Sequence, residues 1–154
     1  TGKVNGELIE DTLDWFAQDK DGNVWYFGEN AKQIVGGLIV GVEGSWTAGV
    51  DGAKPGIIMK AHPAIGDFYR QEFSLGTAED MAEVLSLTES VPASYCSLGN
   101  CLMTKETSPL EPDALENKYY APGVGNVRTV DLVTGEILDL ITVVPPSVNK
   151  ANIK

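Results

Sequence analysis

"DTLDWFAQDKDGNVWYFGENAK", residues 11–32, is the stretch that decides the expected fold. Leu8 to Gln18 has the pattern of a β-strand, with Leu13, Trp15 and Ala17 on one face and Phe16 on the other. Val24 to Gly28 has the composition of a return strand, and Asp19 to Gly22 between them is a strong turn signal. The stretch therefore predicts an antiparallel hairpin, with apolar side chains on both of its faces.

Further short strands are expected along the rest of the chain, at 37–49, 56–61, 67–74 and in a second hairpin at 127–143. Gly-rich or Pro-rich segments separate them, and 17 glycines favour tight turns over long helices. Regularly spaced short strands predict a mainly β fold, arranged as an antiparallel sandwich, a barrel or a curved sheet.

Residues 77–87 are the one ambiguous segment. Thr77 with Asp80 three positions later is typical of a helix N-cap, and Met81, Val84 and Leu85 fit helical spacing. Alternation from Glu83 onward fits a strand equally well. The expected fold therefore contains at most one short helix, near 77–87.

Length favours one domain, because 154 residues suffice for a single hydrophobic core. We assign residues 1–144 to a single β-rich domain. Residues 145–154 form a polar C-terminal tail without periodicity, which we expect to dock on its own domain or on a neighbour.

The acidic composition limits the partners. A formal net charge of −11 and a pI near 4.4 repel phosphate backbones, so we expect no nucleic-acid partner. The same charge is compatible with divalent cations, and it also keeps a secreted protein soluble. No apolar run reaches the roughly 18 residues of a transmembrane segment, so none is expected.

Cys96 and Cys101 are the only cysteines, in the segment CSLGNC. Their spacing around Gly99 fits a disulfide that closes a small loop, and it does not fit a zinc ribbon or a redox C-x-x-C motif. A disulfide indicates an oxidising compartment. The alternative is two buried free thiols.

The acidic loop has two interpretations. Asp19, Asp21 and Asn23 alternate as oxygen ligands do in calcium loops, which makes them a weak calcium site. An EF-hand would need Gly at the sixth position and Glu at the twelfth, where this chain has Val24 and Asn30. In the alternative, the same side chains accept hydrogen bonds from the turn backbone and need no metal.

No catalytic motif stands out. His62 is the only histidine, which excludes a histidine-based triad or a multi-histidine metal site within the chain. Nothing in the sequence selects a pair for glycosidase-like chemistry from the 22 acidic residues, which include Asp14, Glu29, Asp51, Glu72 and Glu116. Six aromatic residues are candidates for lining a pocket, with packing in the core as the alternative: Trp15, Trp25, Trp46, Tyr69, Tyr119 and Tyr120.

Four segments carry a resemblance to a family of uncharacterised bacterial exported domains. They are EDTLDWFAQDKDGNVWYFGE, GSWTAGVDGAKPGIIM, IGDFYRQEF and PLEPDALENKYYAPGVGNV, and the similarity extends over residues 5 to 140. The resemblance implies a β-rich, exported domain of a bacterium with no established activity, located in the periplasm, outside the cell or at its surface. It also implies strands ahead of Gly6, so that a second chain would complete the sheet.

Three function classes are therefore compared. The first is a non-catalytic exported or cell-surface module for binding or assembly, which pairs at a sheet edge with a partner chain or with itself. The second is a carrier of a small apolar ligand or lipid in a curved sheet. The third is a carboxylate-based hydrolase, which requires a cleft with two close carboxylates, one of raised pKa. No cofactor is expected apart from the calcium alternative.

Overall fold

The structure is a computed structural model that describes residues 1–144, so the predicted tail at 145–154 lies outside the described residues. Every regular element in the described part is a β-strand, and all pairings are antiparallel, which confirms the expected mainly β class. Accordingly, no described residue belongs to a helix that could cross a membrane.

The N-terminal sheet contains four short strands in the order β1-β2-β5-β6. Their bounds are β1 Gly2–Val4, β2 Glu7–Glu10, β5 Gln33–Val35 and β6 Leu38–Gly41. The expected strand from Leu8 to Gln18 is thus divided in two, because β2 pairs with β5 whereas the residues after Thr12 pair with a different strand.

The central sheet has the order β10-β8-β4-β3, and β7 also pairs with β4. Its strands are β3 Leu13–Gln18, β4 Val24–Asn30, β7 Trp46–Thr47, β8 Lys54–Met59 and β10 Glu72–Phe73. β3 and β4 form the predicted hairpin, with Gln18 opposite Val24 and Leu13 opposite Asn30.

The third sheet has six strands in the order β15-β14-β13-β12-β11-β9. They are β9 Phe68–Arg70, β11 Met81–Glu89, β12 Cys101–Thr107, β13 Leu115–Ala121, β14 Gly125–Asp131 and β15 Ile137–Asp139. The ambiguous segment is therefore a strand from Met81 onward, since β11 pairs with β12 on one side and with β9 on the other.

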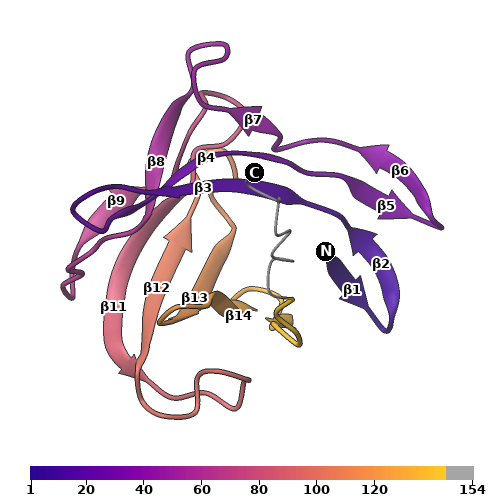
Figure 1. Ribbon diagram of the computed structural model, residues 1–154. Helices are drawn as coiled ribbons and strands as arrows, with labels where there is room; N and C mark the ends of the chain where they lie inside the picture. Colours follow the sequence, from indigo (N-terminus) through magenta and orange to yellow (C-terminus); the bar gives the residue numbers. More distant parts are fainter. Residues whose placement is uncertain (145–154) are drawn as a thin grey trace, which may run out of the picture.

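The sheets are curved and do not close into a barrel within residues 1–144. Figure 1 shows β3 and β4 arching over the six-stranded sheet, with β8 and β9 side by side where the two walls meet. The open side lies opposite this junction, and the first strands of the chain are near it.

Small clusters form the core. One contains Tyr69, Ala82, Val84, Leu102 and Tyr120, against which Ile57 and Met59 pack from the central sheet. A second contains Tyr26, Trp46, Ala53 and Ala78. The third surrounds the Cys96–Cys101 disulfide, which confirms the predicted pairing at a Cα–Cα distance of 5.7 Å.

Gly56 allows the walls to meet closely. A Cβ atom at this position would collide with the backbone of Gln71, on the segment between β9 and β10. Glycine is therefore required there for the approach of two backbones. This close contact brings β8 against the segment that leads from β9 of the six-stranded sheet into β10 of the central sheet.

Candidate functional site

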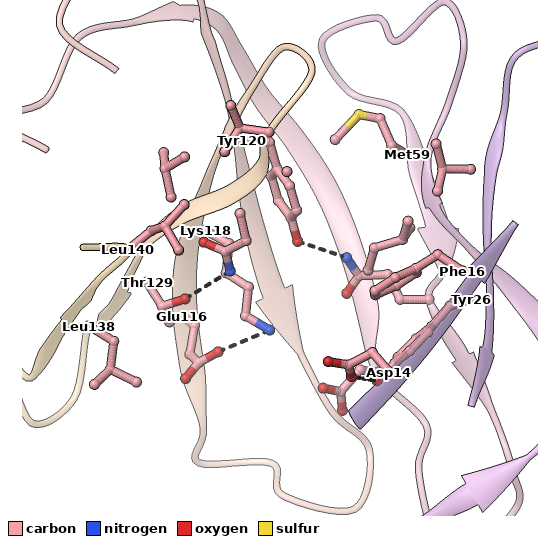
Figure 2. Close-up of a pocket in the computed structure, with 18 of the residues that line it drawn as sticks. Asp14, Phe16, Tyr26, Met59, Glu116, Lys118, Tyr120, Thr129, Leu138 and Leu140 are labelled. Atoms are coloured by element: carbon pink, nitrogen blue, oxygen red, sulfur yellow. Dashed lines mark hydrogen bonds and ion pairs between the residues drawn. The ribbon is translucent and has the colours of Figure 1, made fainter. Parts of the chain in front are cut away.

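A large cavity of about 2010 Å³ occupies the space between the two walls. Figure 2 shows side chains from the hairpin β3–β4 and from β13 to β15 facing each other across it. Alternation along β3 directs Asp14, Phe16 and Gln18 toward this space, as expected when successive strand residues point to opposite faces. The cavity is therefore formed by the inner faces of two curved sheets.

Apolar side chains cover much of the cavity wall. The central sheet contributes Phe16, Ile58 and Met59, and Phe16 stacks on the Tyr26 ring with 4.8 Å between centroids. The opposite sheet contributes Leu102, Val127, Leu138 and Leu140. Phe16 and Leu138 are 52% and 44% exposed and are open to an occupant, whereas Leu102 and Val127 are buried beneath the surface.

Three carboxylates gather on the hairpin side of the cavity. Asp14 accepts a 2.6 Å hydrogen bond from the Tyr26 hydroxyl, and Glu29 and Glu72 are half-buried neighbours. None of the three forms an ion pair with Lys or Arg among the described residues. This side of the cavity therefore concentrates carboxyl groups that have no ion-pair partner among the described residues.

Burial and mutual repulsion shift the protonation of these groups. Partial burial, with the charge of Asp14 as the second cause, raises the pKa of Glu29 to about 7. Burial followed by the charges of Asp80 and Glu29 raises the pKa of Glu72 to about 8. Both carboxyl groups are thus poised to exchange protons near neutral pH.

A polar network centred on the buried Glu106 forms part of the opposite wall, since Gln71, Lys118 and Tyr120 line the cavity. One oxygen of Glu106, Oε1, accepts hydrogen bonds from Gln71 Nε2 at 3.0 Å, from Thr104 Oγ1 at 2.8 Å and from the Tyr120 hydroxyl at 2.8 Å. Lys118 Nζ is 2.8 Å from the other oxygen, Oε2. Glu106 is 3% exposed, so its carboxylate depends on these protein donors and not on water.

The network keeps Glu106 charged in spite of its burial. Burial alone would raise the pKa of Glu106, but the Lys118 ammonium and the donors around it hold the pKa below its usual value. Lys118 also lies 3.5 Å from Glu116 at the cavity surface. Lys118 and Glu116 therefore form an ion pair at the cavity surface, beside the apolar side chains (Figure 2).

The acidic loop is a braced turn. Oδ1 of Asp19 accepts the backbone N–H groups of Asp21 and Asn23, and Oδ2 accepts Nδ2 of Asn23 and Nε1 of Trp25. Asn23 Oδ1 accepts the N–H of Ala61. The predicted turn is confirmed, and hydrogen bonding lowers the pKa of Asp19 to about 2, with Trp25 as the main cause.

Calcium ligation would have to compete with these bonds. Both oxygens of Asp19 and the amide oxygen of Asn23 already accept protein donors, which leaves Asp21 as the one free side chain of the three. In the described part of the chain, no group of three or more His, Cys, Asp or Glu residues is arranged to hold a metal ion. The geometry thus favours the turn interpretation.

Of the six aromatic candidates, Tyr120 lines the large cavity and the other five lie away from it. Trp46 and Tyr69 are buried in separate core clusters, and Tyr119 packs beside the disulfide. Trp15 and Trp25 project to the outer face of the hairpin. There Trp25 lines a smaller hollow of about 360 Å³ together with Phe27 and Pro55. Phe16 and Tyr26 line the cavity together with Tyr120, but they were not among the candidates predicted from the sequence. Alternation along β3 and β4 points their side chains into it.

The sequence contains the carboxylates of the site, but no pattern distinguishes them from the other acidic residues. Asp14, Glu29, Glu72 and Glu116 line the cavity, whereas Asp51 lies in an exposed turn. His62 is exposed at the cavity rim. Asp14 and Tyr26 could have been paired from the hairpin register, and Glu72 could not, because it arrives from a distant strand.

Comparison with known proteins adds no assignment. No family model, no curated protein and no solved structure matches this chain.

Proposed function

We propose that this protein is a non-catalytic binding module of a bacterial exported protein, whose cavity takes an amphiphile with an apolar chain and a positively charged head. One observation carries the proposal. The cavity between the walls combines open apolar surface with Asp14, Glu29 and Glu72, which have no ion-pair partner among residues 1–144. The Cys96–Cys101 disulfide supports a location outside the cytoplasm.

The size and the charge of the cavity favour this ligand chemistry. Drug-sized ligands fill pockets of roughly 300–1,000 Å³, so about 2010 Å³ suits a long-chain molecule. An anionic head would meet the unpaired carboxylates at a cost in repulsion and desolvation. An ammonium group would instead replace their lost hydration and hold Glu29 and Glu72 in the charged form.

Calorimetry with three twelve-carbon probes tests the proposal: dodecylamine, dodecanol and dodecanoate. Dodecylamine should bind tightest and dodecanoate weakest. Because the amine favours charged Glu29 and Glu72, binding at pH 7 should release protons, which is measured by repeating the titration in buffers of different ionisation enthalpy. Equal affinity for the three probes, or an absence of binding, would contradict the proposal.

Charge-matched variants locate the effect. Glu72→Gln should weaken dodecylamine binding roughly tenfold and reduce the proton release, since one ionic contact contributes about 1.4 kcal/mol or more when partly buried. Asp21→Asn changes the net charge equally at the distant turn and should leave both quantities unchanged. An equal loss in the two variants would indicate a general surface-charge effect.

A carboxylate-based hydrolase is the second candidate, favoured by the raised pKa values of Glu29 and Glu72 in one cavity. One group would donate a proton while a neighbouring carboxylate such as Asp14 acts as base or nucleophile. Hydrolysis of nitrophenyl glycosides and esters tests it. Activity should rise and fall with pH around 7 to 8 and disappear in Glu72→Gln; no turnover by the wild-type chain removes this candidate.

A further inference from the structure

β3 is an edge strand with an unusually open environment. Within residues 1–144 it pairs only with β4, so its other side presents unpaired backbone N–H and C=O groups. All six of its residues are exposed. Leu13 is 62% exposed, Trp15 40% and Phe16 52%, so neither face of the strand is covered.

This edge lacks the features that normally prevent pairing with another chain. Edge strands are commonly shortened, interrupted by proline or filled with charged residues. β3 runs for six residues without proline, and Asp14 is its single charged residue. The strand therefore remains a competent template for strand addition.

The opposite side of the cavity mouth is also a sheet edge. β15 is the last strand of the six-stranded sheet, and all three of its residues are exposed. Ile137 and Leu138 of β15 line the same cavity as Asp14 and Phe16 of β3. A strand added to β3 would therefore cover part of the open mouth between the two walls (Figure 1).

The existing pairing at this edge gives the direction of an added strand. β1 pairs antiparallel with β2, and Gly2 lies opposite Glu10, three residues before β3 begins at Leu13. β1 and the free side of β3 lie along the same edge, because β2 and β3 pair on their other sides with β5 and β4. An added strand antiparallel to β3 would run in line with β1.

We propose that β3 accepts an extended segment of a partner protein, antiparallel to it, which alternates basic and apolar side chains. The basic residues would face the cavity beside Asp14 and near Glu29, neither of which has an ion-pair partner among residues 1–144. The apolar residues would lie on the outer face beside Leu13 and Trp15. Such cross-strand pairs supply specificity, while the backbone hydrogen bonds supply affinity.

Charge argues against a second copy as the occupant. Asp11, which lies 3.6 Å from Lys32, and Asp19 bracket β3, and antiparallel pairing of two β3 strands would bring the Asp11 end of one copy to the Asp19 end of the other. Each copy also has a formal net charge of −11. A basic segment matches this edge, whereas a like-charged copy is repelled from it.

Hydrogen exchange with a designed peptide tests the proposal on the full chain. A short peptide alternating lysine and valine should bind and slow the exchange of β3 amides, with little change in β12 at the centre of the six-stranded sheet. Its counterpart with glutamate in place of lysine should not bind. A lysine–valine peptide N-methylated at alternate amides should bind at least about tenfold more weakly, because it loses the donors of the strand ladder.

Two further measurements separate the alternatives. Asp14→Asn keeps an acceptor for Tyr26 but removes the charge, and should weaken the lysine–valine peptide and flatten the salt dependence of its binding. Light scattering should show that the free chain does not dimerise through β3. Undiminished binding of the N-methylated peptide, unprotected β3 amides, or a dimer with protected β3 amides would each overturn the proposal.

Discussion

The two ends of the β3–β4 hairpin treat a carboxylate in opposite ways. At the turn, Asp19 receives two backbone and two side-chain hydrogen bonds, and its pKa falls to about 2. At the other end, Glu29 lies half-buried beside Asp14 and its pKa rises to about 7. The difference teaches that the number of hydrogen-bond donors around a carboxylate distinguishes a structural carboxylate from one available to a ligand. The number of acidic residues nearby in the sequence does not.

Glu106 extends the comparison to a third environment and gives the largest expected effect. Lys118→Met should leave a buried carboxylate without its ammonium partner and lower the free energy of unfolding by about 3 kcal/mol. Urea denaturation measures the change. Lys105→Met, on the neighbouring strand, is the matched control and should change stability little. Adding Glu106→Gln to Lys118→Met should recover part of the loss; no recovery would mean that lost packing, not charge, is responsible.

The cavity carboxylates should destabilise the folded state as pH rises. Their folded pKa values exceed the usual 4.5, so the folded chain binds protons more tightly, and stability declines between about pH 4.5 and 8. The double variant Glu29→Gln, Glu72→Gln should flatten this decline and gain about 2 kcal/mol at pH 8, after allowance for partial solvent screening. A decline of equal slope in the variant would place its origin elsewhere.

Asp19 should show the reverse pH dependence, with a smaller effect. Its depressed pKa stabilises the fold above about pH 4, and this contribution is lost as pH falls toward 2. Asp19→Ala should lower the melting temperature at neutral pH, because four donors lose their acceptor. The loss should be smaller than in Lys118→Met, because water can reach these donors in the exposed turn. Asp21→Ala, which removes no hydrogen bond accepted by its side chain, should have almost no effect. Similar losses in both variants would contradict the bracing role of Asp19.

Calcium gives the smallest expected effect. Since Asp19 and Asn23 already accept internal donors, millimolar calcium should change the melting temperature little relative to the same concentration of magnesium. Differential scanning calorimetry measures this shift. A calcium-specific rise of many degrees that disappears in Asp21→Ala would restore the metal interpretation of the loop.

Local features of the molecule could be predicted from the sequence. The β3–β4 hairpin follows from alternation and from the Asp-Gly turn, and the Cys96–Cys101 disulfide follows from a short spacing around Gly99. Both depend on residues close together in the chain. Residues 77–87 fit helix and strand equally until β9 and β12 are known to flank them, so tertiary pairing decided that segment.

The site required long-range pairing and could not be predicted to the same extent. Asp14 and Glu29 share a hairpin, but Glu72 reaches them through the pairing of β10 with β8 and of β8 with β4. The cavity also depends on Gly56, whose missing side chain lets the segment at Gln71 approach. No local pattern states which of the 22 acidic residues meet.

The braced turn also bears on how the chain finds its fold. β3 and β4 are adjacent in sequence. All four hydrogen bonds that the Asp19 side chain accepts come from residues 21–25, so the turn is held by local contacts. Hairpins of this kind form within microseconds, far sooner than sheets that join distant segments. We therefore expect this hairpin to be the first ordered unit, a template onto which β8 docks, so that removing the Asp19 side chain slows refolding more than it speeds unfolding.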